Sequence, residues 1–358
     1  MSSTNIKRLF LTLSIFLLII LGCNSNKKQI TYGISPYQDT ILPIVAEKQG
    51  WYKTEGLDVK IKILEWGDVM NSLAGGAVDI AIQNFNSFQA VYNNINEKGG
   101  DVIFYFPYFI FKGTAIMARD TTKFKTINYF LNLYPNNREK AIVETVKQLK
   151  GRVVITTKGT EMEQIVLSAM NKAGLKESDV KIIHALPADG LNAFLHGDGD
   201  FYSGGVTERT EARKHGAIEL IETSDLNPPV VDGLVTTEKF AKEHKKELNK
   251  IIKLWFKTIQ WMEEDLDKRS KLVIEYLSSV SSTKYTLDEY KYTWFHTEVF
   301  PRNIDEVNNL TLQPNSYYYW KNSWDSNNQF LISEKKISKP VPYTAFWGEK
   351  IYNIINEN

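Results

Sequence analysis

Cysteine is almost absent from this chain, since Cys23 is the only one in 358 residues. A single thiol cannot close an internal disulfide, and it leaves no cysteine cluster for a structural zinc site. Histidine is sparse too: the five histidines are scattered along the sequence, and none forms an H-E-x-x-H pair. A G-x-S-x-G motif and a phosphate-binding loop with G-K-S or G-K-T are also missing. We therefore expect neither an enzyme nor a bound metal or cofactor.

An excess of charge of either sign is missing as well. The chain carries 43 Lys and Arg against 42 Asp and Glu, which gives a formal net charge of +1. A near-neutral chain does not favour nucleic acid as a partner. The apolar fraction of 43% is ordinary for a globular protein. A chain of 358 residues exceeds one comfortable hydrophobic core, so we expect two lobes. We also expect the protein to be a monomer.

One apolar run stands out near the start of the chain. It covers residues 9–21 and follows the basic pair Lys7 and Arg8. A membrane-spanning helix needs about 20 apolar residues, so this run is too short to span a bilayer. Its length and its basic start are typical of the hydrophobic region of a secretory signal peptide.

The run ends at residues 20–23 in the sequence ILGC, which resembles the lipobox of bacterial lipoproteins. The resemblance implies cleavage before Cys23, lipid on its thiol and a stable membrane anchor. We expect a lipoprotein signal peptide at 1–22 and a lipidated tether at 23–29. The protein is then an extracytoplasmic, membrane-anchored lipoprotein in the periplasm or at the cell surface. The alternative is an ordinary signal peptide with an incidental cysteine.

Strand and helix patterns alternate beyond the tether. Residues 29–35 alternate like a strand, a short apolar helix ends at Gly50, and residues 57–64 alternate again. A strand, a helix and a strand at this spacing form a βαβ unit with a parallel pair. A further helix and a short apolar strand follow in residues 65–87.

Three stretches resemble one protein family. They are AEKQGWYKTEGLDVKIKI with SLAGGAVDIAI (46–82), LKGRVVITTKGTEMEQIVLSAMNKAGL (149–175) and PADGLNAFLHGDGDFYS (187–203). In this order and spacing they resemble the periplasmic solute-binding proteins for nitrate, alkanesulfonates, taurine and thiamine pyrimidine precursors. The resemblance implies an α/β fold of the two-lobed periplasmic binding protein type (type II), with a ligand cleft between the lobes. It also implies a receptor that delivers a small molecule to the permease of an ABC importer.

The same resemblance suggests how the chain is divided. We expect lobe 1 to consist of residues 30–113 and 232–358, and lobe 2 of residues 114–231. Residues 111–119 and 228–237 are the candidate crossing strands, and the chain beyond 238 reads as helical. Residues 121–148 form an additional helical hairpin in this reading. The aromatic stretch 315–326 is either a contact for the permease or a segment packed on lobe 1, and we favour packing.

Ligands in open parallel sheets bind beyond the carboxyl ends of the strands, where helix N-termini present free amides. Four loops of this kind are readable, at 35–39, 65–68, 84–87 and 158–161. The candidate ligand-binding residues are Tyr37, Gln38, Trp66, Asn84, Asn86, Thr160, Glu161, Gly204, Gly205 and Thr207. For these residues the alternatives are loop surface, core packing or helix capping.

Glu161 departs from what a receptor for anions would carry. A carboxylate in the first turn of a helix stabilises that helix but disfavours a bound anion beside it. If Glu161 points into the cleft, sulfonate and nitrate are disfavoured as ligands, and a neutral or amine-bearing ligand is favoured. If it points to solvent, it carries no information about the ligand.

Two functions remain open from the sequence. The first is a lipid-anchored receptor that passes a sulfonate, nitrate or thiamine-pyrimidine-like solute to an ABC permease. The second is a sensory or accessory ligand-binding lipoprotein without a transport role.

Overall fold

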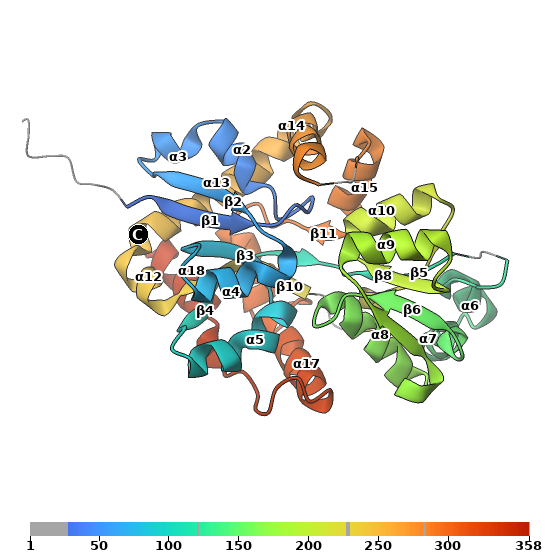
Figure 1. Cartoon of the computed structure of the whole chain (residues 1–358). Helices are drawn as coiled ribbons and strands as arrows, with labels where there is room; N and C mark the ends of the chain where they lie inside the picture. Colours follow the sequence, from blue (N-terminus) through green and yellow to red (C-terminus); the bar gives the residue numbers. More distant parts are fainter. Residues whose placement is uncertain (1–27, 120–121, 227–229, 282–283, 358) are drawn as a thin grey trace, which may run out of the picture.

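The computed structural model describes residues 28–119, 122–226, 230–281 and 284–357. The predictions for the signal peptide and for Cys23 lie outside these residues. Two β-sheets with helices packed on them form two lobes that lie side by side (Figure 1). The predicted α/β class is therefore confirmed.

Lobe 1 is built on a six-stranded sheet in the order β11-β4-β10-β3-β1-β2. Its strands are β1 (Ile30–Ile34), β2 (Val59–Ile63), β3 (Ile80–Asn84), β4 (Val102–Phe111), β10 (Val230–Thr237) and β11 (Glu298–Val299). β1 pairs in parallel with β2 and with β3, as the βαβ pattern predicts. β10 is antiparallel to both β3 and β4. The two-residue β11 interrupts the C-terminal part that the sequence predicts to be helical, because a strand this short leaves no alternation to read.

Eleven α-helices cover this sheet in the described residues. They are α2 (Pro43–Lys48), α3 (Trp51–Thr54), α4 (Val69–Ala74), α5 (Phe85–Glu97), α12 (Glu238–Glu243), α13 (Lys245–Glu264), α14 (Leu266–Val280), α15 (Leu287–His296), α16 (Ile304–Val307), α17 (Trp320–Ser333) and α18 (Gly348–Asn356). Gly50 follows α2 with φ 71°, in the left-handed conformation predicted for the end of that helix. Short 3-10 or π turns occupy Trp66–Asp68, Asn308–Leu312 and Tyr343–Ala345.

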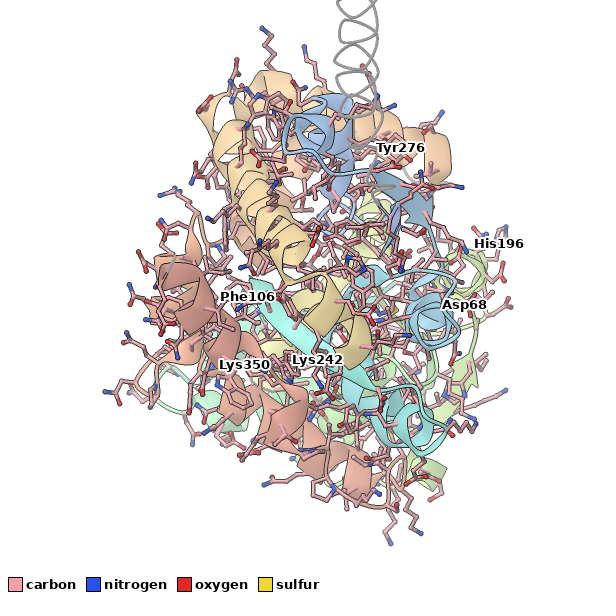
Figure 2. The ribbon with its side chains drawn as sticks, turned by 90° about the vertical axis from the view of Figure 1, so that its left-hand side faces the viewer. Asp68, Phe106, His196, Lys242, Tyr276 and Lys350 are labelled. Atoms are coloured by element: carbon pink, nitrogen blue, oxygen red, sulfur yellow. The ribbon has the colours of Figure 1, made fainter. Side chains whose placement is uncertain are left out.

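Aromatic side chains fill the core of lobe 1. Trp255 of α13 stacks on Tyr108 of β4, with ring centroids 4.5 Å apart. Figure 2 looks onto this side of the lobe, where Phe106 lies in the interior and Lys242 is exposed. Trp324 in the aromatic stretch is fully buried, and its ring centroid is 4.8 Å from that of Phe85. The prediction that this stretch packs on lobe 1 is confirmed.

Lobe 2 is built on a five-stranded sheet in the order β7-β6-β8-β5-β9. Its strands are β5 (Ala115–Ala118), β6 (Val153–Thr156), β7 (Lys181–His184), β8 (Phe201–Gly204) and β9 (Ile218–Glu222). Its helices are α6 (Ile127–Leu133), α7 (Arg138–Val146), α8 (Glu161–Lys172), α9 (Pro187–His196), α10 (Val206–Lys214) and α11 (Thr223–Leu226), with 3-10 turns at Lys147–Leu149 and Glu177–Asp179. α6 and α7 are the predicted additional hairpin.

The chain crosses between the lobes twice. The first crossing is residues 112–114 between β4 and β5, so the single strand predicted over 111–119 is wrong. Gly113 breaks it: its φ is +110°, and a Cβ there would lie 2.3 Å from Thr223 Cβ. The buried Arg209 of α10 holds this segment by donating to the Gly113 carbonyl at 2.9 Å. The second predicted crossing strand, 228–237, overlaps β10, which pairs with β3 and β4 inside the lobe 1 sheet, and its residues 228–229 lie outside the described residues. The lobe boundaries at 113/114 and 231/232 stay a prediction.

Candidate functional site

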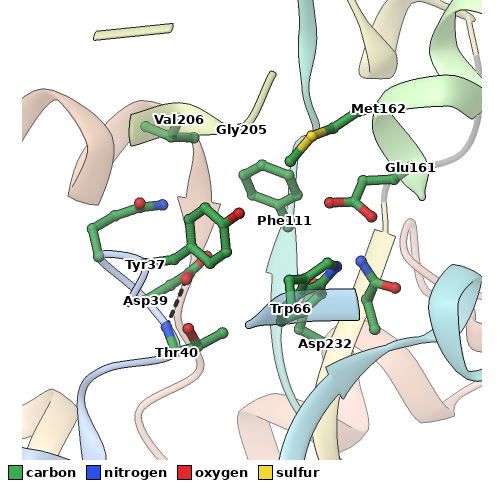
Figure 3. A pocket seen from close by; sticks show the side chains of 12 residues that line it. Tyr37, Asp39, Thr40, Trp66, Phe111, Glu161, Met162, Gly205, Val206 and Asp232 are labelled. Carbon is green, nitrogen blue, oxygen red and sulfur yellow. Dashed lines mark hydrogen bonds between the residues drawn. The ribbon is translucent and has the colours of Figure 1, made fainter. Parts of the chain in front are cut away.

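A pocket of about 350 Å³, which includes the solvent at its mouth, lies between the two lobes (Figure 3). Its walls are segments that follow β1, β2 and β3 in lobe 1 and β6 and β8 in lobe 2. Parallel strands end at the same edge of a sheet, so these segments are brought together by the topology. The lining residues are Tyr37, Gln38, Asp39, Thr40, Trp66, Asn84, Phe111, Glu161, Met162, Gly205, Val206 and Asp232.

The antiparallel strands of lobe 1 add two further residues to this edge. Asp232, near the start of β10, is paired with Asn84 at the end of β3. Phe111, at the end of β4, is paired with Val230. Because β10 runs against its neighbours, its beginning lies where β3 and β4 end.

Six of the ten predicted site residues line this pocket, namely Tyr37, Gln38, Trp66, Asn84, Glu161 and Gly205. Asn86 lines a neighbouring cavity with Glu161, and its side-chain amide donates to Gln164 Oε1 across the lobes. A Cβ on Gly205 would lie 3.3 Å from the Tyr37 ring of the other lobe. Glycine therefore allows the close approach of the lobes at this point.

The remaining three predicted residues do not line the pocket. Thr160 is the N-cap of α8: its hydroxyl accepts from the Met162 amide at 3.2 Å and donates to the Thr157 carbonyl. A Cβ on Gly204 would lie 2.3 Å from the Tyr202 ring, so this glycine makes room for the core. The Thr207 hydroxyl is 2.9 Å from the Tyr285 hydroxyl. A ligand role for these three residues stays a prediction.

The residues that the sequence reading missed are Asp39, Thr40, Phe111, Met162, Val206 and Asp232. One of them had a usable signal. Asp232 interrupts the apolar strand sequence VVDGLV, where an unpaired acid is costly to bury. The apolar members are indistinguishable from core residues in the sequence alone.

Three carboxyl groups face the pocket from different elements: Asp39, Glu161 and Asp232, each more than nine-tenths buried. Burial raises the pKa of Asp39 to about 7, although the Thr40 amide donates to its Oδ1 at 2.6 Å. Burial raises the pKa of Asp232 well above its usual range, and the charges of Asp39 and Glu161 add to that. Burial also raises the pKa of Glu161, while its own amide and the Asn84 and Trp66 side chains pull it down.

Two more buried acids lie behind the lining. Glu298 Oε1 accepts from Gln38 Nε2 at 2.7 Å, and the Tyr285 hydroxyl donates to Gln38 Oε1 at 3.3 Å. Glu208 is next to Gly205, and burial raises its pKa to about 7. The pocket is therefore surrounded by carboxyl groups on both lobes.

The apolar part of the pocket is aromatic. The rings of Tyr37 and Trp66 meet edge to face with centroids 5.9 Å apart. Phe111 and the Met162 thioether face them from the other side (Figure 3). Flat faces at this spacing can hold a small planar or compact ligand.

A metal centre is not among the features of this site. No group of three or more His, Cys, Asp or Glu side chains in the described residues is placed to hold a metal ion. Over the same residues, every helix is too short or too polar to cross a bilayer.

The family model that matches this sequence covers residues 24–276, and its description is the NMT1-like family. The chain belongs to the NMT1-like family. This NMT1-like protein is 26% identical over 286 residues to a protein of Bacillus subtilis (strain 168) that is named as an aliphatic sulfonates-binding protein. The aligned region covers 74% of this chain and 77% of that relative.

Solved structures share the fold. The periplasmic aliphatic sulphonate binding protein from Escherichia coli matches with a TM-score of 0.63 at 14% identity, over 88% of this chain and 91% of that one. The periplasmic nitrate-binding protein from Synechocystis PCC 6803 matches with a TM-score of 0.56 at 14% identity, over 92% and 85%. A ligand-binding component of an ABC-type import system from Staphylococcus aureus matches with a TM-score of 0.62 at 14% identity, over 91% and 98%. The predicted periplasmic binding protein fold and the predicted family are thus confirmed.

Proposed function

We propose that this protein is an extracytoplasmic solute-binding receptor, which captures a small molecule between its lobes and delivers it to the permease of an ABC importer. The observation that carries the proposal is a buried pocket walled by both lobes, with Trp66 and Asn84 on one side and Glu161 and Met162 on the other. The relatives support it, because their names describe binding proteins for sulfonates and nitrate.

The membrane anchor is part of this proposal and rests on the sequence. A lipid on Cys23 and the tether 23–29 would keep the receptor near its permease. Residues 1–22 would be removed as the signal peptide. The solute classes suggested by the family are sulfonates, nitrate and thiamine-pyrimidine-like molecules.

Capture requires the lobes to close, and several contacts in the structure join them. Glu163 of α8 in lobe 2 is 3.1 Å from Lys336 Nζ of lobe 1. Burial alone would raise the pKa of Glu163, but the Gly159 amide, Lys336 and His184 outweigh it and hold the pKa below its usual range. The carboxylate therefore stays charged and attracts Lys336. We infer that this ion pair acts as a latch that favours the closed arrangement.

Replacing Lys336 by glutamine is expected to shift the lobes towards an open arrangement. The affinity for the bound solute should fall about threefold to tenfold, since a partly exposed pair contributes about 1 kcal/mol. Small-angle X-ray scattering should report a larger radius of gyration for the variant. Lys339→Gln is the matched control, because Lys339 pairs with Glu97 at the same 3.1 Å but within lobe 1. If the two variants have the same radius of gyration and the same affinity, the ion pair between Lys336 and Glu163 does not act as a latch.

Native mass spectrometry tests the receptor function directly. The protein from residue 24 onward is purified gently and weighed before and after mild denaturation. We expect an excess mass that disappears on unfolding, and the mass identifies the solute. If the protein carries nothing, and no compound in a panel of sulfonates, nitrate, pyrimidines and amines raises its melting temperature, the receptor proposal fails.

A further inference from the structure

The residues that line the pocket carry charge of one sign only. Asp39, Glu161 and Asp232 are acidic, and none of the 12 described lining residues is Lys, Arg or His. Among the described residues, the buried cationic side chain is Arg209, whose guanidinium already pairs with Glu219 at 2.9 Å and Glu222 at 2.6 Å. No positive side chain in the described pocket is therefore available to neutralise these acids.

Carboxylate oxygens in and beside the pocket also lack hydrogen-bond partners. Glu161 Oε2, Asp232 Oδ2 and Glu208 Oε2 behind Gly205 are buried without a partner. The Trp66 indole N–H is also unpartnered, but one donor cannot satisfy all three oxygens. Figure 3 shows the Glu161 carboxyl group pointing into the pocket towards Trp66. Buried acceptors left in this way are costly unless something donates to them. A donor in the pocket would satisfy them.

At two of the helix starts beside the pocket, amides that an anion could use are taken by the protein itself. At the start of α8 the Gly159 amide donates to Glu163 Oε2 at 2.8 Å, and the Met162 amide donates to Thr160. At the start of α5 the Ser87 amide donates to Asn84 Oδ1 at 2.9 Å. Helix N-termini bind anions through free amides, and these ends have acceptors of their own.

The aromatic wall suits a positive ligand. Tyr37, Trp66 and Phe111 surround the same space as the carboxyl groups, and aromatic faces attract cations. In the part of the chain that the structure describes, no three of these carboxyl groups are placed to coordinate one metal ion.

We propose that the solute held between the lobes is a compact organic cation, with its positive nitrogen at Glu161 and Asp232 and its carbon face against Trp66 and Tyr37. This inference rests on the proposed receptor function and specifies its solute class. It sets this pocket apart from the sulfonate and nitrate sites that the relatives' names imply.

A cation and an anion would have opposite effects on the protons of the site. The charged or titratable groups facing this cluster are Tyr37, Asp39, Glu65, Glu161, Tyr202, Glu208, Arg209, Asp232, Tyr285 and Glu298. Burial raises the pKa of Asp39 and Glu208 to about 7, so part of the cluster is protonated at neutral pH without ligand. A cation favours the ionised acids and releases protons when it binds. An anion favours the protonated acids and takes protons up.

The test compares three probes that share a phenylmethyl group and differ in charge: benzylammonium, benzyl alcohol and phenylmethanesulfonate. Titration calorimetry on the protein from residue 24 onward, freed of any retained solute, gives each affinity between pH 6 and 8. Benzylammonium is expected to bind at least 10-fold more tightly than the other two and more tightly at pH 8 than at pH 6. In two buffers of different ionisation heat, its binding should release protons.

Variants locate the effect in the pocket. Glu161→Gln and Asp232→Asn keep the side-chain shape and are expected to weaken benzylammonium at least 10-fold while leaving benzyl alcohol unchanged. Asp68→Asn is the matched control, since Asp68 is an exposed acid two residues from Trp66 and outside the lining. Circular dichroism confirms that each variant is folded.

Two results would overturn the cation proposal. One is tighter binding of phenylmethanesulfonate with proton uptake, which would leave the receptor function intact. The other is no preference for benzylammonium and no effect of the two pocket variants on its binding. If the purified protein also carries no solute of any charge, the proposed receptor function is contradicted as well.

Discussion

Replacing Gly233 by alanine is expected to lower the free energy of unfolding by about 3 kcal/mol or more, as severe overpacking does. Gly233 lies in the middle of β10, between β3 and β4. A Cβ at this position would lie 2.2 Å from the Phe106 carbonyl oxygen and 2.8 Å from Pro107 Cα. Backbone atoms in a central strand cannot move aside as a flexible side chain can. The strand would have to separate from β4 to accept one methyl group.

The same substitution should also damage the site. The register between β10 and β4 shifts between Asp232 and Gly233, and Asp232 lines the pocket. Urea unfolding followed by circular dichroism measures the stability, and titration of the retained solute measures the binding of the folded fraction. Gly67→Ala is the control, because nothing lies within 4 Å of a Cβ there and the change should stay within about 1 kcal/mol. A Gly233→Ala protein as stable as this control would contradict the prediction.

The ligand-free protein is expected to lose stability as the pH rises from 5 to 8. Burial raises the pKa of Asp39 from 3.8 to about 7 and that of Glu208 from 4.5 to about 7. A carboxyl group whose pKa is higher in the folded protein stabilises it at low pH. That contribution is lost as the pH rises towards the folded pKa. Asp232 and Glu298 have pKa values raised well above the usual range and extend the loss to higher pH.

The size of this effect follows from the shifts. One pKa unit corresponds to about 1.4 kcal/mol, and local relaxation reduces the sum, so we expect a loss of about 2–4 kcal/mol between pH 5 and 8. The acids with lowered pKa, Glu163 and Glu289, titrate below their usual value of 4.5 and do not enter this window. Urea unfolding at each pH measures the slope.

A double variant tests the cause of the slope. Asp39→Asn with Glu208→Gln should leave the unfolding free energy at pH 5 nearly unchanged and raise it at pH 8. The asparagine keeps an acceptor for the Thr40 amide, which donates to Asp39 in the parent. Stability that rises with pH in the parent, or an unchanged slope in the variant, would show that these acids are not buried as described.

Local chemistry determined much of this protein from the sequence alone. The alternating residues of β1 and β2 and the glycine that ends α2 were readable because strand pleat and helix termination depend on neighbours a few residues apart. Three motif stretches in order were enough to predict the family, which the match over residues 24–276 confirms. Loops at strand ends then located five of the pocket residues, because parallel strands must end at one edge.

Only the tertiary structure decided what kind of site these loops make. Asp39, Glu161 and Asp232 are far apart in the sequence and meet because two sheets and an antiparallel strand converge on one cavity. The first turn of a helix can face solvent or protein, so the direction of Glu161 depended on where lobe 1 lies against α8. Thr160 and Glu161 are adjacent, yet one caps the helix and the other lines the pocket. Residue type and local pattern carry no information about which surface the opposite lobe covers, and that contact determines the burial and the charge of the site.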